Sequence, residues 1–175
     1  EYSGRGGKQA FTRFLVTSRN HLAGFGNNAW SFMLFARSQG WLRFRKQLPD
    51  ALQPLVMDES WAFGQSSNTT AIDEEDQREL ITEAVESLRA GKRVAILESQ
   101  DPESILRQLL TQTDIDQRAG ISFAIGLQPS SQRPFQLQFP ADIDVGTRSD
   151  LSRDGVKLLR PRTMAKSQLT WDRYE

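Results

Sequence analysis

Two runs of alternating apolar residues lie on either side of a loop rich in Pro and Ser, within residues 121–139. Their apolar side chains recur at every second position: Ile121, Phe123, Ile125 and Leu127, then Phe135, Leu137 and Phe139. A period of two is typical of a half-buried β-strand, because successive side chains point to opposite faces. The stretch therefore predicts a β-hairpin with one apolar face that other parts of the chain must cover.

Helical spacing of apolar residues is clearest over residues 73–90. Asp73 is a suitable N-cap, three acidic residues follow it in the first turn, and Gly91 comes after the last turn. The apolar residues form one stripe: Leu80, Ile81, Ala84, Val85 and Leu88. The pattern predicts a helix with one buried face and one acidic, solvated face.

A strand and a second helix are expected directly afterwards. Residues 92–98 place apolar side chains on both faces, which is typical of an interior strand. Asp101-Pro102 supplies a capping residue and a proline at the first helical position, and predicts a helix over 102–110. With the strand at 121, this order predicts a strand-helix-strand unit with a right-handed crossover. We expect one of the two helices to approach the small residues on the second face of the hairpin, Ser122, Ala124 and Gly126.

The remaining elements lie nearer the ends of the chain. Residues 10–17 predict a strand, and Asn28 caps a mostly apolar, buried helix over 29–38. Residues 148–155 predict a charged turn, and 156–159 a last strand.

Together these elements predict an α+β (mixed α/β) fold. We expect a small mixed sheet with a strand-helix-strand unit and a C-terminal hairpin, covered by two or three helices. The composition changes at the polar stretch 64–70. We therefore expect a basic N-terminal segment at 1–70 that packs on the rest, an α/β core at 71–160 and a basic C-terminal tail at 161–175.

Charge is unevenly distributed, although the net charge is zero. Residues 1–70 carry 8 basic and 4 acidic groups, residues 71–150 carry 8 and 15, and residues 151–175 carry 6 and 3. Segments of opposite sign favour complementary protein surfaces over the single basic face of a nucleic-acid binder. We therefore expect a protein partner.

The absence of Cys excludes disulfides, thiolate metal sites and cysteine nucleophiles, and fits a reducing compartment. The longest apolar run, 29–36, is far shorter than the roughly 20 residues of a membrane span. We expect a cytoplasmic protein without a membrane partner.

Motifs for cofactors and metals are weak. The Gly-rich opening, 1–8, does not match the phosphate-binding loop G-x-x-x-x-G-K-[ST], because Gly4 and Gly7 are too close and Gln9 follows Lys8. The single His21 has no neighbouring Cys or His with which to bind a metal. No cofactor, metal or catalytic residue is therefore assigned.

Two acidic residues after the hairpin suggest an alternative. Asp142 and Asp144 in the sequence D-x-D-x-G-T resemble the nucleophile and acid of phosphoryl-transfer enzymes of the haloacid dehalogenase type. That chemistry also needs a downstream Lys and further acids on a long α/β core, and few residues remain here.

A second alternative is nucleic-acid binding. Aromatic and basic residues interleave at Trp41, Arg43, Phe44, Arg45 and Lys46, a pattern that single-stranded nucleic-acid grooves use. An edge strand with a charged outer face explains the same residues. We therefore treat these five residues as a possible interaction site, for which nucleic acid is the less favoured partner.

Two blocks of sequence resemble bacterial GTPase-associated proteins of conflict and signalling gene clusters. The first comprises Gly6-Gly7-Lys8-Gln9, Phe11-Thr12, Leu15-Val16, Phe25 and Asn27-Asn28. The second comprises Ser122-Phe123, Gly126-Leu127, Pro129-Ser130 and Arg133-Pro134-Phe135. The resemblance covers about a third of the chain and implies an adaptor or regulatory component that works beside a GTPase or another NTPase. We therefore expect a non-catalytic interaction domain. The alternatives are a phosphate- or nucleotide-handling enzyme that uses Asp142 and Asp144, and a nucleic-acid-binding module.

Overall fold

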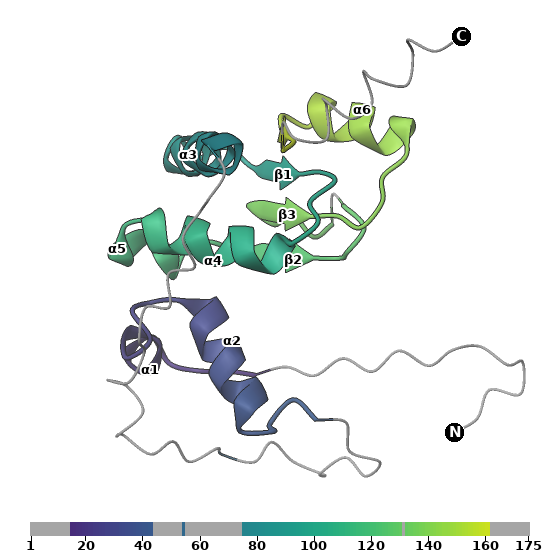
Figure 1. Ribbon diagram of the computed structural model, residues 1–175. Coiled ribbons are helices and arrows are strands. Elements are labelled where there is room, and N and C mark those ends of the chain that lie inside the picture. Colours follow the sequence, from purple (N-terminus) through teal and green to yellow (C-terminus); the bar gives the residue numbers. More distant parts are fainter. Residues whose placement is uncertain (1–14, 44–53, 55–74, 131, 162–175) are drawn as a thin grey trace, which may run out of the picture. The chain divides into compact units, whose positions relative to one another are not determined.

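The structure is a computed structural model that describes residues 15–43, 54, 75–130 and 132–161 (Figure 1). The chain divides into two compact units, Glu1–Gly64 and Gln65–Glu175. Residues 10–14 of the predicted strand at 10–17, and residues 162–175 of the predicted tail at 161–175, lie outside the described residues. Residues 15–17 are not part of a strand.

Two helices, α1 (Arg19–Ala23) and α2 (Ala29–Ser38), form the described part of the first unit. The predicted helix over 29–38 is confirmed with the same bounds, and its predicted cap is present. The Asn28 side chain accepts a hydrogen bond from the backbone N–H of Ser31 at 3.1 Å. Asn27, with φ of 56°, reverses the chain just before this cap. Asn adopts this left-handed conformation more readily than most residues, which explains its position between the two helices.

Aromatic rings fill the space between these helices. The ring of Phe25 lies 5.4 Å from the rings of both Phe32 and Phe35, and Trp41 meets Phe35 edge to face at 5.3 Å. Such offset and edge-to-face pairs add about 0.5–1.5 kcal/mol each to the burial of apolar surface. The apolar residues of α2 therefore build a small core, as their lack of a polar face predicted.

Four short parallel strands form the sheet of the second unit: β1 (Val94–Ile96), β2 (Phe123–Ile125), β3 (Leu137–Phe139) and β4 (Lys157–Leu159). Their order across the sheet is β2-β3-β1-β4. The predicted α+β fold is confirmed, as are the interior strand and the strand-helix-strand unit. The sheet is parallel in all its described pairs and not mixed.

The predicted hairpin at 121–139 is wrong. β2 and β3 are neighbours, as expected, but they run parallel, with Phe123 opposite Leu137 and Ile125 opposite Phe139. Alternation defines the two faces of a strand and is the same for either direction, so it did not reveal the pairing. The loop of ten or so residues is also longer than most hairpin loops, which have two to five residues. The connection instead runs from the carboxyl end of β2 back to the opposite edge of the sheet, where β3 begins.

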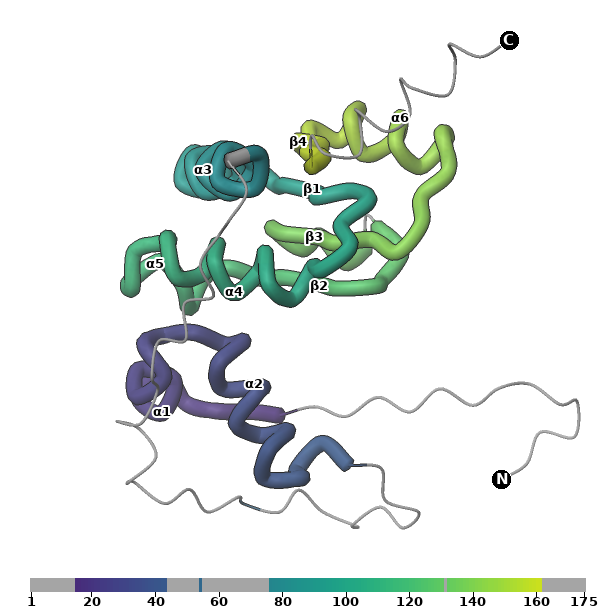
Figure 2. Tube along the Cα trace, in the orientation of Figure 1, coloured from purple at the N-terminus to yellow at the C-terminus, as the bar shows by residue number. Residues whose placement is uncertain are grey.

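Helices lie on both faces of the sheet (Figure 2). The chain passes from β1 through α4 (Pro102–Gln112) and α5 (Ile115–Arg118) to β2, and from β3 through α6 (Val145–Arg153) to β4. These two connections run in opposite directions across the sheet. Right-handed crossovers therefore place α4 and α6 on opposite faces.

The first face carries α3 (Glu75–Arg89), which packs on α4 and contacts β1 and β4. Lys157 on this face forms an ion pair with Glu83 of α3 at 2.7 Å. The register places further side chains on the same face, all of them buried: Val94, Ile96, Leu137, Phe139 and Leu159. The facing helices contribute Leu80, Ile81, Ala84 and Val85, and Ile105, Leu106, Leu109 and Leu110. Full burial of each large aliphatic side chain contributes up to about 1.5–3 kcal/mol before entropy is subtracted.

The second face packs against α6. Ala95 and Leu97 form a cluster with Leu151 of α6 and with Val156. Ala124 lies on this second face, because it is in register with Gln138 and Ala95. The expectation that the helix at 73–90 or at 102–110 would cover the small residues is therefore wrong, since both helices cover the opposite, apolar face.

The predicted charged turn at 148–155 is instead most of α6. Asp144 caps this helix, but Leu151 is its single buried residue. A helix that buries so little has no apolar stripe, so the hydrophobic pattern did not reveal it. The segment between α4 and β2, for which the sequence predicted no helix, likewise contains the short helix α5.

We predict that Leu106→Ala lowers the free energy of unfolding by about 2–5 kcal/mol, because Leu106 is fully buried and its truncation leaves a cavity. Chemical denaturation of both proteins measures this change. Leu127→Ala is the matched control, since that side chain is 45% exposed, and should cost no more than about 0.5 kcal/mol. Equal losses from both substitutions would contradict the assigned core.

Candidate functional site

The carboxyl ends of all four strands lie along one edge of the sheet, since the strands are parallel. The chain leaves β1 toward one face and the neighbouring β3 toward the other. In open α/β sheets, ligands bind at this kind of switch point, outside the carboxyl ends of the strands. We therefore built the candidate site from the residues that follow β1, β3 and β4.

Four residues gather at this edge, and we name them the Glu98 cluster: Glu98, Ser99, Arg148 and Arg160. Glu98 follows the buried end of β1, and its Oε1 accepts a hydrogen bond from Arg148 of α6 at 2.9 Å. The same oxygen lies 3.6 Å from Arg160, directly after β4. Three segments that are distant in sequence thus bring one carboxylate and two guanidinium groups together.

The backbone of Glu98 is strained. Its φ of 57° lies in the left-handed region, which costs an L-residue about 1–2 kcal/mol. The ion pairs do not offset much of this cost, because partly exposed pairs contribute about 0–1 kcal/mol. The side chains of Glu98, Arg148 and Arg160 are 36%, 33% and 48% exposed.

Two polar atoms of the Glu98 cluster are buried and unsatisfied. Ser99 Oγ and Arg148 Nε have no hydrogen-bond partner in the part of the chain that the structure describes. A buried donor without a partner costs about 1–3 kcal/mol, and more when it is charged. The cluster therefore holds more hydrogen-bond donors than its single carboxylate accepts from.

Asp144 has a structural role. Its carboxylate accepts a hydrogen bond from the backbone N–H of Thr147 at 2.7 Å and so caps α6. This hydrogen bond is the main reason that the pKa of Asp144 is lowered from its ordinary value. Asp142 is exposed, and its backbone oxygen accepts a hydrogen bond from Gln128 Nε2 at 2.8 Å. Of the two acids in the D-x-D sequence, Asp144 thus stabilises the fold as the N-cap of α6.

The other residues considered in the sequence belong to the first unit. Trp41 is half-buried against Phe35, so part of its ring is used in packing. Arg43 is exposed, and its side chain lies beside Gly40. Phe44, Arg45 and Lys46 lie outside the described residues, so the proposed interaction site at these five residues stays a prediction. His21 is exposed on α1.

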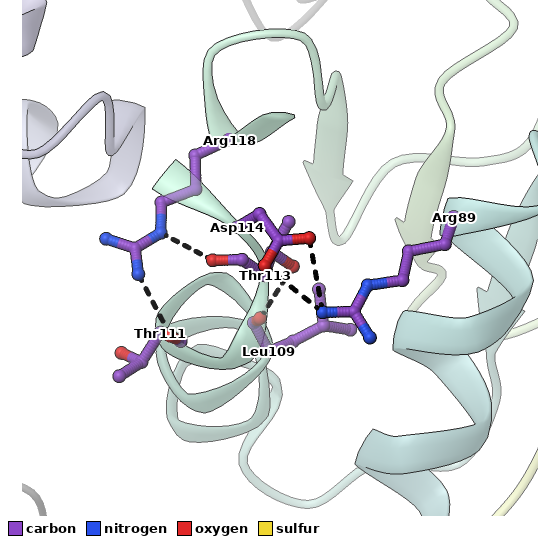
Figure 3. A network of polar contacts seen from close by, with 6 residues as sticks. All are labelled: Arg89, Leu109, Thr111, Thr113, Asp114 and Arg118. Carbon is purple, nitrogen blue, oxygen red and sulfur yellow. Dashed lines mark hydrogen bonds and ion pairs between the residues drawn. The ribbon is translucent and has the colours of Figure 1, made fainter. Parts of the chain in front are cut away.

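A polar network joins the helices at the end of α4 that is remote from the Glu98 cluster (Figure 3). Arg118 donates from Nε to the backbone oxygen of Thr113 and from Nη2 to that of Thr111, both at 2.9 Å. Arg89 of α3 forms an ion pair with Asp114 at 3.3 Å. The cationic side chain satisfies carbonyl groups at the negative end of the α4 dipole, so we assign this network to stability.

Within 15–43, 54, 75–130 and 132–161, no three His, Cys, Asp or Glu residues are grouped so that they could hold a metal ion. The same residues include no helix with the length and apolar character needed to cross a membrane.

Comparison with family models found no match, and comparisons with curated proteins and with solved structures found none either.

No pattern in the sequence predicted the Glu98 cluster. Glu98 could have been suspected, because it is the charged last residue of the predicted interior strand at 92–98. Arg148 and Arg160 had no such signal. They join Glu98 only through α6 and the parallel pairing of β4 with β1, and neither feature was predicted.

We predict that Asp144→Ala lowers the thermal unfolding midpoint at neutral pH. Asp144→Asn should have a midpoint close to that of the wild type, because Asn is an equally good N-cap. The lowered pKa means that the ionised carboxylate stabilises the fold above the pKa of the unfolded chain. That contribution declines as the pH falls below the ordinary Asp pKa of about 3.9 and is lost as the pH passes through the lower folded value. The difference between wild type and Asp144→Asn should therefore shrink below about pH 4 and disappear only below the folded pKa. Thermal unfolding followed by circular dichroism across this pH range measures both effects. Asp142→Asn, in the loop before the cap, is the control, and equal midpoints for Asp144→Ala and the control would contradict the capping role.

Proposed function

We propose that the predicted α/β core at 71–160 is a non-catalytic interaction or regulatory module whose binding surface is the carboxyl edge of the sheet. A GTPase or another NTPase is the class of partner that the sequence resemblance implies. The module would act by docking on this partner, with no chemical step of its own.

The observation that carries this proposal is the pair of exposed apolar residues at that edge. Val145, the first residue of α6, is 77% exposed, and Leu127, just after β2, is 45% exposed. The hydrogen bond from Gln128 to Asp142 ties together the segments that carry them. Apolar side chains flanked by charged ones are typical of the anatomy of protein interfaces.

The alternative of a phosphoryl-transfer enzyme has less support. A nucleophile or general acid must be able to reach the substrate and change its bonding, whereas the carboxylate of Asp144 is engaged by Thr147 at the start of α6. A lowered pKa also disfavours proton donation by Asp144 near neutral pH.

We predict that the double substitution Leu127→Ser and Val145→Ser abolishes capture of the NTPase partner from extracts of the source cells. The loss of both apolar contacts should weaken binding at least about tenfold, since each truncated apolar contact at an interface contributes on the order of 1 kcal/mol. Ile115→Ser is the matched control, because Ile115 is also exposed, at 52%, but begins α5 at the other end of α4. Affinity capture with quantitative mass spectrometry, followed by titration against the purified partner, measures the effect.

Three outcomes would contradict the proposal. They are capture that is equal for the double variant and wild type, loss of capture by Ile115→Ser alone, and a captured protein without NTPase activity. A magnesium-dependent phosphatase activity that Asp142→Asn and Asp144→Asn remove would favour the enzyme alternative instead, because both substitutions are nearly isosteric and Asn preserves the cap.

A further inference from the structure

The Glu98 cluster has an excess of positive charge and of hydrogen-bond donors. Two guanidinium groups carry ten N–H donors between them, and within the described residues they share one carboxylate. Only Arg148 forms a hydrogen bond with it, since Arg160 stands at 3.6 Å and makes an ion pair alone. The cluster therefore has unused capacity for an anion.

Glu98 is poorly suited to fill that capacity permanently. Its carboxylate reaches the arginines from a backbone held at a φ of 57°, a conformation that is rare for an L-residue and that concentrates at functional sites. The side chain is also partly exposed, so that it can swing into solvent. Unsatisfied donors beside it, Ser99 Oγ and Arg148 Nε, are the groups that a larger anion with more oxygens would satisfy.

We propose that the Glu98 cluster is a phosphate-binding site in which the Glu98 carboxylate occupies the place of the phosphate group until the ligand displaces it. A phosphate group carries up to two negative charges and three acceptor oxygens, whereas a carboxylate carries one charge and two oxygens. It can therefore accept from Arg148 and Arg160 together, and charge-assisted hydrogen bonds of this kind are among the strongest in proteins. The tethered carboxylate competes with the ligand, so binding to the wild type is weak, and sequestering Glu98 elsewhere would strengthen it.

The site stands at the switch point between β1 and β3, where ligands of parallel sheets bind. It lies at the same carboxyl edge as the partner surface proposed above but uses neither Leu127 nor Val145, so the two proposals are tested with different residues. The phosphate could belong to free inorganic phosphate or to a nucleotide, and both sources are tested separately.

The test titrates the full chain and its variants with inorganic phosphate, and in a second series with GDP, at constant ionic strength by isothermal calorimetry. Glu98→Gln removes the competing charge with little change of shape and should bind phosphate about tenfold more tightly than wild type. Arg148→Gln and Arg160→Gln should each weaken binding to Glu98→Gln about tenfold. Tighter binding of GDP than of phosphate would identify a nucleotide as the source, and equal or weaker binding would identify inorganic phosphate.

Arg153→Gln in the Glu98→Gln background is the matched control. Arg153 lies on the same helix as Arg148, is 76% exposed and pairs with Asp150, away from the Glu98 cluster. It should leave the affinity unchanged. Equal loss from Arg153→Gln and Arg148→Gln would show general charge attraction and overturn the proposal. So would unchanged affinity in Glu98→Gln, or no binding by any variant that retains the wild-type circular dichroism spectrum. The proposed partner surface would survive either result, because its test uses other residues.

Discussion

The second unit depends on the burial of β1 on both faces. Val94, Ala95 and Ile96 are completely buried, and β1 has a parallel neighbour on each side. Its pairing with β3 and β4 supplies ladder hydrogen bonds on both sides, which a strand buried on both faces requires. The helices α3 and α4 pack on one face of the sheet around β1, and α6 packs on the other. The positions of all three helices therefore follow from one short strand of apolar residues.

The same constraint creates the candidate site. A central strand buried on both faces must end at the surface, and the first residue past its buried end is Glu98. β4 lies beside β1, so Arg160 emerges next to it, and α6 starts from the neighbouring β3 and brings Arg148. The charged residues meet because the strands are parallel and end together, and their meeting owes nothing to proximity in sequence.

Sequence analysis succeeded where one local signal determined the structure. The caps Asn28 and Asp101, the apolar character of α2 and the apolar stripes of α3 and α4 predicted those helices to within two residues at each end. It failed where the structure depends on partners that are distant in the chain. Strand direction at 121–139 depends on which edges pair, and alternation carries no information about it. The chemistry at Glu98 was missed for the same reason, since Arg148 and Arg160 are ordinary surface arginines until the sheet is assembled.

The connections between successive strands of the sheet differ in structure. Helices connect β1 to β2 and β3 to β4, but the described residues between β2 and β3 form no helix, and Gln138 Nε2 reaches back to the oxygen of Phe135 in that segment. Among the strands that the structure describes, β2 lies at one edge of the sheet and pairs with β3 alone. Amide hydrogens of β2 should therefore exchange with solvent through local opening, while those of β1 exchange only when the whole unit unfolds. The central strand β1 is thus the part of the sheet most protected from exchange, and the edge strand β2 opens more easily.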